Sequence, residues 1–277
     1  MNVTMLGAGA FGGALGLVLE ENRHTIQYFD PYKYPDITLS QALTFAGEAE
    51  GANADNVAQA EVIIVAVPSS VAPELLLELP KNIPIINASK GFISLKPFER
   101  FEDFSMISGP AFAKELLEKK PVTLTATSSL VVELFTTSWL SFDRTEDKLG
   151  VLLCGTLKNI YAIGAGYYAV KSSGNPTYYI NNALVELKSI LAANGANSET
   201  AELACGIGDL TLTCSSTQSR NYQFGQGLAN KTPDDALPAT IEGLSALELI
   251  KHTPDFIIPD TCTIVKNIQE LVYGDPT

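Results

Sequence analysis

The first half of the chain alternates short strand-like apolar runs with stretches of helical periodicity. The strand-like runs occupy residues 2–6, 25–29, 62–67, 83–87, 104–107 and 122–126. Helical spacing follows at residues 13–20, 71–79 and 130–140, whereas polar residues dominate residues 35–60. Because strands that alternate with helices pair in parallel with helices on both faces, this half predicts an α/β fold with a doubly wound parallel sheet of the Rossmann type.

The alternation stops near residue 145. Two long stretches beyond it, residues 149–170 and 178–193, have helical spacing and helical length, and a loop rich in Ser, Gly, Asn and Pro separates them. We therefore predict two domains, an α/β domain at residues 1–145 and an all-α domain at residues 146–277.

A glycine-rich turn, GAGAFG, joins the first strand to the first helix. In this context Gly7 makes the turn, Gly9 lets a pyrophosphate approach the backbone, and Gly12 lets helix and strand pack closely. The helix N-terminus adds free amides and a partial positive charge. The pattern favours a dinucleotide site at Gly7, Gly9, Ala10, Phe11 and Gly12; a glycine-rich turn without a ligand is the alternative.

The second predicted strand ends in Asp30, about 20 residues after the glycine turn, where dinucleotide-binding folds carry an acid that accepts a hydrogen bond from the adenosine ribose. A carboxylate there repels a 2′-phosphate, which favours NAD over NADP, although Lys33 nearby weakens the preference. Alternatively, Asp30 only begins the turn that continues with Pro31.

Composition excludes several classes of protein. A net charge of -13 argues against general nucleic-acid binding, which needs a basic surface, and requires any anionic ligand to be held by a few local cations and backbone amides. No uninterrupted apolar run reaches the roughly 18 residues of a membrane span, and the N-terminus lacks the basic region of a secretory signal. We expect a cytoplasmic protein without a membrane span.

The cysteines have no CxxC spacing and no clustered histidines, so neither a disulfide framework nor a metal site is indicated. We expect them to be small buried residues. They are Cys154, Cys205, Cys214 and Cys262.

Two lysines are candidates for chemistry. Lys90 follows the strand at residues 83–87, and ligands bind beyond the carboxyl ends of strands in open α/β sheets. Lys158 lies among apolar residues of the long helix 149–170, so it either extends along the surface or is buried for a purpose. Burial, or a second ammonium such as Lys90, would lower its pKa toward the range suited to proton exchange.

The segment GIGDLTLTCSSTQSRN, residues 206–221, is too polar for a core element. Asp209 and Thr213 would share one helix face, and Asp209 would pair with Lys158. Arg220 and Asn221 offer a planar fork and an amide suited to a phosphate. The alternative is a helix start capped by Asp209 or by Ser219. Together with the glycine turn, the segment favours a dehydrogenase acting on a small phosphorylated alcohol.

The order of these motifs resembles that of bacterial-type NAD(P)-dependent sn-glycerol-3-phosphate dehydrogenases over nearly the full length. The matching motifs are GAGAFGGAL from Gly7, VAVPS from Val65, ASKG from Ala88, SGPAFAKE from Ser108, GTLKN from Gly155, GIGDLTLTCSSTQSRN from Gly206, and IEG from Ile241. The resemblance implies reversible hydride transfer between NAD(P)H and dihydroxyacetone phosphate, giving sn-glycerol 3-phosphate for phospholipid synthesis. It implies that the protein binds a small phosphorylated substrate. A homodimer is among the oligomeric states that we consider.

The resemblance also implies roles for individual residues. Lys158 resembles the general acid/base, Asp209 the residue that orients it, and Lys90 a catalytic contact to substrate and cofactor. Further substrate contacts are expected from Gly109, Thr213, Ser219, Arg220 and Asn221. Further cofactor contacts are expected from Pro68, Ala113, Arg220 and Glu242.

Some positions depart from the family pattern. Ala111 stands where Ser or Thr is usual, and Phe11 where Trp or Tyr is frequent. The usual arginine after the second strand is missing from residues 29–31, Asn181-Asn182-Ala183 replaces the usual threonine-arginine-glycine run, and the sequence ends earlier than is typical. Two alternatives remain open: a dehydrogenase of another small hydroxy acid or phosphorylated alcohol, and a dinucleotide-sensing protein without turnover.

Overall fold

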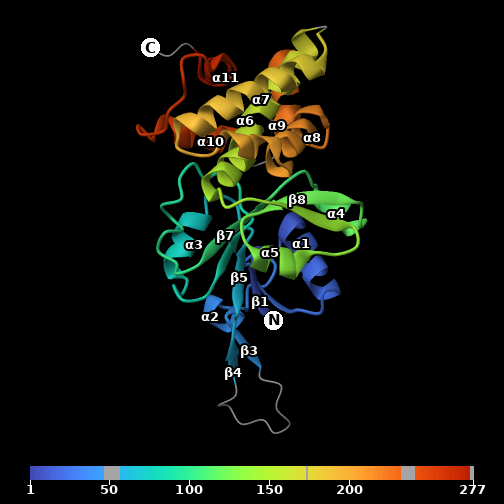
Figure 1. The fold of residues 1–277 in the computed structure, drawn as a ribbon, viewed down its shortest axis with the longest axis vertical. Helices are drawn as coiled ribbons and strands as arrows, with labels where there is room; N and C mark the ends of the chain where they lie inside the picture. Colours follow the sequence, from blue (N-terminus) through green and yellow to red (C-terminus); the bar gives the residue numbers. More distant parts are fainter. Residues whose placement is uncertain (47–56, 173, 232–240, 275–277) are drawn as a thin grey trace.

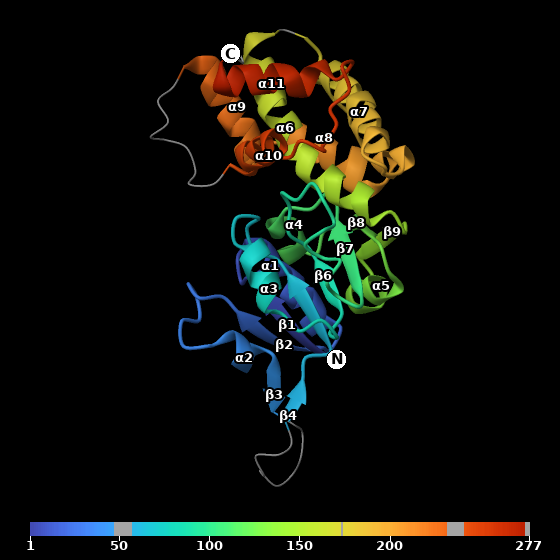
Figure 2. The same cartoon turned by 90° about the vertical axis from the view of Figure 1, so that its left-hand side faces the viewer.

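An α/β half and a helical half follow one another along the longest axis of the molecule (Figure 1). The computed structural model describes residues 1–46, 57–172, 174–231 and 241–274. Turning the molecule shows the helical half seated over one end of the sheet, with β7 pointing toward it (Figure 2). The predicted combination of a Rossmann-type sheet with an all-α C-terminal part is confirmed.

Seven strands form the main sheet in the order β2-β1-β5-β6-β7-β8-β9. Their bounds are β1 Asn2–Leu6, β2 Thr25–Phe29, β5 Val62–Val65, β6 Ile85–Asn87, β7 Phe104–Ser108, β8 Val122–Ala126 and β9 Leu140–Arg144. The poorly patterned region before β5 contains a short helix, α2 Leu39–Ala42, and an antiparallel pair, β3 Thr44–Ala46 with β4 Val57–Gln59. Residues 47–56 of that region lie outside the described part of the chain.

The sheet is not parallel throughout, which corrects the prediction at one pair of strands. β8 runs antiparallel to β7, with Ile107 opposite Ala126 and Ser108 opposite Thr125. A parallel connection must return the chain to the opposite edge, usually through a helix. The helix between these strands, α4 Ala113–Leu117, has only 5 residues, and β8 starts at the edge where β7 ends.

The last strand, β9, was not predicted: its first residue, Leu140, was placed at the end of a helix over residues 130–140, and the rest of the strand was assigned to no element. The helix α5 Ser129–Phe135 ends earlier, and the chain then pairs in parallel with β8. β9 lies at the edge of the sheet and only its first residue, Leu140, is fully buried. An edge strand with this little burial lacks the continuous apolar run that marks the central strands.

Successive residues of β5 face opposite sides of the sheet, and each side has its own core. Ile63 and Val65 belong to the cluster that includes Leu76 of the helix α3 Ala72–Glu78. Val62 and Ile64 belong to the cluster that includes Leu15 of α1 Ala10–Glu21. Because both faces are covered, β5 is apolar without interruption, which is why the sequence predicted it.

The helical half is built around one helix, α6 Lys148–Lys171. All residues from Gly150 to Gly166 are buried, and the helix packs against every longer helix of this half. These are α7 Pro176–Ala193, α8 Asp209–Ser215, α9 Arg220–Asn230, α10 Glu242–Lys251 and α11 Thr263–Tyr273. By length and hydropathy α6 alone among the described helices could cross a membrane, but 94% of its apolar window is buried inside the protein. It is the core helix of this half.

All four cysteines are free and buried, as the sequence predicted.

β9 ends at Arg144 and α6 begins at Lys148, so the change from mixed to helical structure falls next to the predicted boundary. The division into two domains at residue 145 stays a prediction that this position supports.

Candidate active site

A cleft of about 420 Å³ lies where the carboxyl ends of the strands meet the helical half. Loops after β1, β5, β6 and β7 form one wall, and α6, α8, α9 and α10 form the other. It brings together most of the predicted site residues: Gly9, Ala10, Phe11, Gly12, Pro68, Lys90, Ala113, Lys158, Asp209, Thr213, Ser219, Arg220, Asn221 and Glu242. A larger cavity of about 680 Å³ lies behind the loop of residues 91–97 and contains none of them.

Three predicted residues do not line the cleft. Gly7 turns the backbone beneath the glycine loop with a φ of 98°. Gly109 is held against β8, where an added Cβ would lie 2.9 Å from the Cα of Leu124. Asp30 lies beside the glycine loop rather than in the cleft. Gly7 and Gly109 therefore shape the backbone of the site.

The glycine loop fits the pyrophosphate of a dinucleotide. An added Cβ at Gly12 would lie 2.1 Å from the carbonyl oxygen of Gly7, so only glycine allows α1 to start this close to β1. At Gly9 an added Cβ would have no atom within 4 Å, which leaves the backbone open to a ligand. The first turn of α1 has neither a capping side chain nor an acidic residue. Its amides and the helix dipole are available to an anion.

Asp30 fixes the geometry of the same loop. Its Oδ2 accepts a hydrogen bond from the Ala8 amide at 2.8 Å, and its Oδ1 accepts from the amides of Tyr32 and Lys33 at 3.0 and 3.2 Å. The Lys33 ammonium donates to the carbonyl oxygen of Ala8. The turn-forming alternative is therefore a real role of Asp30, and a contact to the ribose stays a prediction.

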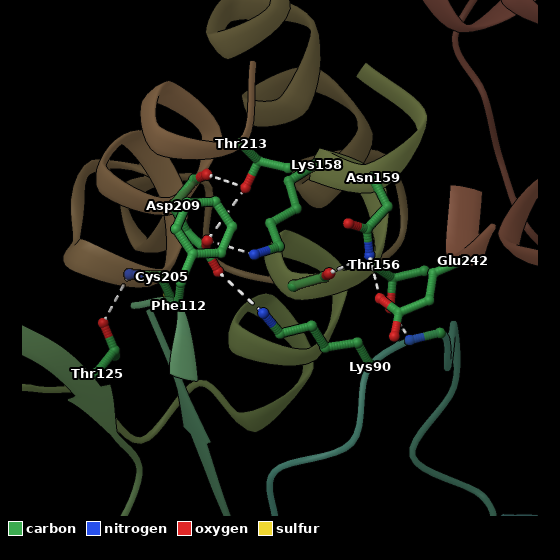
Figure 3. Close-up of polar contacts among 12 residues, drawn as sticks. Lys90, Phe112, Thr125, Thr156, Lys158, Asn159, Cys205, Asp209, Thr213 and Glu242 are labelled. Atoms are coloured by element: carbon green, nitrogen blue, oxygen red, sulfur yellow. Dashed lines mark hydrogen bonds and ion pairs between the residues drawn. The ribbon is translucent and has the colours of Figure 1, made fainter. Parts of the chain in front are cut away.

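Two lysines from different halves of the chain meet at one buried carboxylate (Figure 3). Lys158, on α6, pairs with Oδ1 of Asp209 at the start of α8, and both side chains are at least 95% buried. The Lys90 ammonium lies 3.6 Å from Oδ2 of the same aspartate, and its side chain is 20% exposed. The sequence predicted the Lys158–Asp209 pair, and the structure shows it.

Thr213 holds Asp209 in place. Its hydroxyl lies 2.6 Å from the backbone oxygen of Asp209 and 3.3 Å from Oδ1, which confirms that the two residues share a helix face. Asp209 does not cap α8, whose N-cap is Gly208. Ser219 does cap a helix, because its Oγ accepts from the Tyr222 amide at the start of α9.

The two lysines differ in their electrostatics. Burial lowers the pKa of Lys158 to about 8, Asp209 opposes that effect, and Lys90 lowers the pKa further. Burial also lowers the pKa of Lys90, but Asp209 and Glu242 more than offset it, so the pKa of Lys90 lies above its ordinary value. Lys158 is thus suited to exchange a proton near neutral pH, while Lys90 remains a cation.

A second hydrogen-bonded chain crosses the cleft floor. The Asn159 amide donates to Oε2 of Glu242 at 3.0 Å and accepts from the Asn221 amide at 2.9 Å. Oδ1 of Asn221 in turn accepts from the Gly243 amide at 2.9 Å. Both ends of the Asn221 side chain are engaged within the protein, but its amide nitrogen carries a second N–H besides the one donated to Asn159, so direct contact to a phosphate stays a prediction.

Asn159 is a site residue that sequence reasoning missed. It follows Lys158 in the GTLKN motif, and only the position of α9 and α10 reveals that it orients Glu242 and Asn221. At the rim of the cleft, Arg220 is exposed at the first position of α9. On the opposite wall, the Lys90 ammonium lies 5.7 Å from the centre of the Phe11 ring.

A Rossmann-type sheet whose glycine turn faces a buried lysine–aspartate pair is the arrangement of a nicotinamide-dependent dehydrogenase. Residues 147–276 match the family described as NAD-dependent glycerol-3-phosphate dehydrogenase C-terminus. A glycerol-3-phosphate dehydrogenase, NAD(P)+, of Ruthia magnifica is 31% identical over 278 residues, covering 90% of this chain and 86% of the relative. The corresponding protein of Bifidobacterium longum subsp. infantis is 30% identical and covers 82% and 79%. The chain belongs to the glycerol-3-phosphate dehydrogenase family.

A solved structure has the same fold. The glycerol-3-phosphate dehydrogenase of Coxiella burnetii superposes with a TM-score of 0.76 at 24% identity, covering 98% of this chain and 94% of that one. At 24% identity, this similarity shows that the two proteins share a fold.

Proposed function

We propose that this protein catalyses reversible hydride transfer between NAD(P)H and dihydroxyacetone phosphate, giving sn-glycerol 3-phosphate that phospholipid synthesis can use. The observation that carries the proposal is the buried Lys158–Asp209 pair, with Lys90 beside it, in a cleft whose opposite wall is the glycine turn. The names of the Ruthia magnifica and Bifidobacterium longum relatives, both glycerol-3-phosphate dehydrogenase, NAD(P)+, support it.

The cofactor would lie along the sheet side of the cleft. The amides of Ala10 and Phe11 would hold the pyrophosphate, and Pro68 and Ala113 would border the ring end, where Glu242 is oriented by Asn159. The nicotinamide supplies or accepts the hydride when it is bound.

The residues of the helical half manage the proton and the substrate charge. During reduction, the carbonyl oxygen of the substrate gains an electron pair as the hydride adds to its carbon, and Lys158 gives that oxygen a proton. During oxidation, neutral Lys158 takes the proton from the hydroxyl. Asp209 holds the Lys158 ammonium in place, Lys90 polarises the carbonyl, and Arg220 at the rim pairs with the phosphate.

One assay tests the proposed function: oxidation of NADH followed across a panel of ketone phosphates and small oxo acids. We expect turnover with dihydroxyacetone phosphate and little with unphosphorylated oxo acids, because the cleft presents cations at both the carbonyl and the rim. Turnover confined to an oxo acid would replace the proposed substrate. Tight NADH binding without oxidation by any compound would identify a dinucleotide-sensing protein instead.

A second prediction concerns cofactor choice. We expect kcat/KM for NADH to exceed that for NADPH by roughly tenfold or more, equivalent to about 1.4 kcal/mol, because the Asp30 carboxylate beside the glycine loop repels a 2′-phosphate. Asp30→Asn should narrow the ratio, since it removes the charge and keeps one acceptor oxygen. Asp36→Asn, at an exposed position in the loop that follows β2, is the matched control and should leave the ratio of the two kcat/KM values unchanged. A clear preference of the unaltered protein for NADPH would refute the role of Asp30.

Three sequence-based predictions also belong to this proposal. They are the homodimer, the cytoplasmic location, and the division into a dinucleotide-binding domain at residues 1–145 and a substrate domain at residues 146–277. The burial of α6 within the helical half supports the last of these.

A further inference from the structure

A buried hydroxyl on the helix that carries Lys158 makes hydrogen bonds to the loop that carries Lys90. Thr156 lies on α6, and its side chain is completely buried. Its Oγ1 accepts a hydrogen bond from the Gly91 amide at 3.1 Å and lies 2.7 Å from the carbonyl oxygen of Phe92, to which it donates. The hydroxyl therefore holds two consecutive residues immediately after Lys90.

This contact joins the two halves of the molecule at the site. Gly91 and Phe92 follow β6 in the α/β half, whereas Thr156 precedes Lys158 by half a helical turn in the helical half. Lys90 is next to the bonded amide, and its ammonium lies 3.6 Å from Asp209. A small movement of the loop relative to α6 changes that distance directly.

The bonds of Thr156 resist such a movement. A buried backbone amide or carbonyl that loses its partner loses free energy, so the loop is held where both groups are paired. Replacing the hydroxyl by a methyl group of similar size removes both bonds to the loop, together with the contact of the hydroxyl to the Leu152 carbonyl at 3.1 Å within α6, without opening a cavity. The loop must then shift until its amide and carbonyl find other partners.

We propose that Thr156 is a positioning residue that fixes Lys90 against Asp209 and Lys158 by tying the Lys90 loop to α6. The inference rests on the proposed function, because it assigns a role within the same site. Thr156 is fully buried and lies outside the residues that line the cleft, so it acts through Lys90.

The charges around Lys158 determine whether a displacement of Lys90 raises or lowers the pKa of Lys158. Asp209 and Cys214 from α8 and Lys90 from the loop interact with Lys158. Glu242 from α10 acts on Lys90, and Arg220 of α9 lines the same cleft. Burial raises the pKa of Cys214, which therefore stays a neutral thiol. Lys90 is the cation that lowers the pKa of Lys158, so moving Lys90 away raises that pKa.

The experiment compares Thr156→Val with Thr156→Ser in the full-length protein. We expect Thr156→Val to lower kcat for dihydroxyacetone phosphate by roughly tenfold to a hundredfold, because a displacement of about 1 Å at a reacting group costs on that order. The basic limb of its kcat/KM profile should move to higher pH. Thr156→Ser keeps the hydroxyl and should restore both properties. Thr156→Cys, a near isostere of the serine variant with weak hydrogen bonding, replaces the valine variant if that variant does not fold, and is compared with Thr156→Ser.

The matched control is Thr4→Val. Thr4 is also completely buried and donates its hydroxyl to a backbone oxygen, that of Ala42, at 2.6 Å. It should lower the melting temperature without moving the pH profile. A Thr156→Val protein with the kcat and profile of the wild type would overturn the proposal. So would a Thr156→Ser protein as impaired as the valine variant, or a Thr4→Val protein with the same shift.

A measurement that needs no turnover separates this inference from the proposed function. Competitive labelling with acetic anhydride, read by mass spectrometry across a pH series, reports the pKa of Lys158 in each variant. A higher pKa of Lys158 in Thr156→Val than in the wild type supports the positioning role, even if the protein reduces no ketone phosphate. The absence of ketone phosphate reduction would refute only the proposed function. Equal pKa values in an active enzyme would refute only the role of Thr156.

Discussion

Replacing Lys158 by alanine is expected to lower kcat for reduction of dihydroxyacetone phosphate by on the order of 10²-fold or more, the typical worth of a positioned acid/base. Lys158 is the cleft group whose pKa is lowered to about 8, and Asp209 fixes its ammonium. Lys171→Ala, at the exposed end of the same helix, is the control and should retain full activity. A Lys158→Ala enzyme with nearly the wild-type kcat would remove Lys158 from the mechanism.

The same assignment fixes the direction of the pH dependence. Reduction needs protonated Lys158, so kcat/KM for dihydroxyacetone phosphate should fall as pH rises through about 8. Oxidation needs the neutral amine, so kcat/KM for sn-glycerol 3-phosphate should rise with pH through the same value. Initial rates measured in both directions from about pH 6 to about pH 10 check these opposite pH dependences. Limbs with the same sign in both directions would contradict the acid/base role.

Replacing Asp209 by asparagine should impair both stability and activity. The carboxylate lies between two ammonium groups and is almost fully buried, so its loss leaves Lys158 and Lys90 without their counter-charge. Breaking a buried pair on one side costs about 3–5 kcal/mol of unfolding free energy, measured here by urea denaturation at neutral pH. Asparagine keeps the size of the side chain and an oxygen within reach of Thr213. The loss of unfolding free energy therefore measures the effect of removing the negative charge.

The Asp209→Asn enzyme should also lose its reducing activity at lower pH than the wild type. Asp209 raises the pKa of Lys158, so its removal lowers that pKa, the opposite of the shift expected for Thr156→Val. Asp260→Asn is the control, because Asp260 pairs with Lys266 on the exposed surface and such pairs contribute little. An Asp209→Asn protein as stable as Asp260→Asn would show that the buried carboxylate does not hold the cluster together.

Much of the fold was predictable because local sequence decides it. Central strands such as β5 are covered on both faces and are therefore continuously apolar, and α6 is long and helical in spacing. The antiparallel entry of β8 and the edge strand β9 were not predictable, because the direction and pairing of a strand depend on where the preceding loop delivers the chain.

The site divides in the same way. The sequence by itself determined the glycine turn, because the approach of Gly12 to the Gly7 carbonyl is a local steric requirement, and it identified Lys90, Lys158 and Asp209 as residue types suited to the chemistry. The sequence also predicted that Lys158 pairs with Asp209, and the tertiary structure decided the other partners. The pairing of both lysines with one carboxylate, the engagement of Asn221 by Asn159, and the bonds of Thr156 to the Lys90 loop each join residues far apart in the sequence. Burial and hydrogen-bond partners depend on which segments meet, and a pattern along one chain does not contain that information.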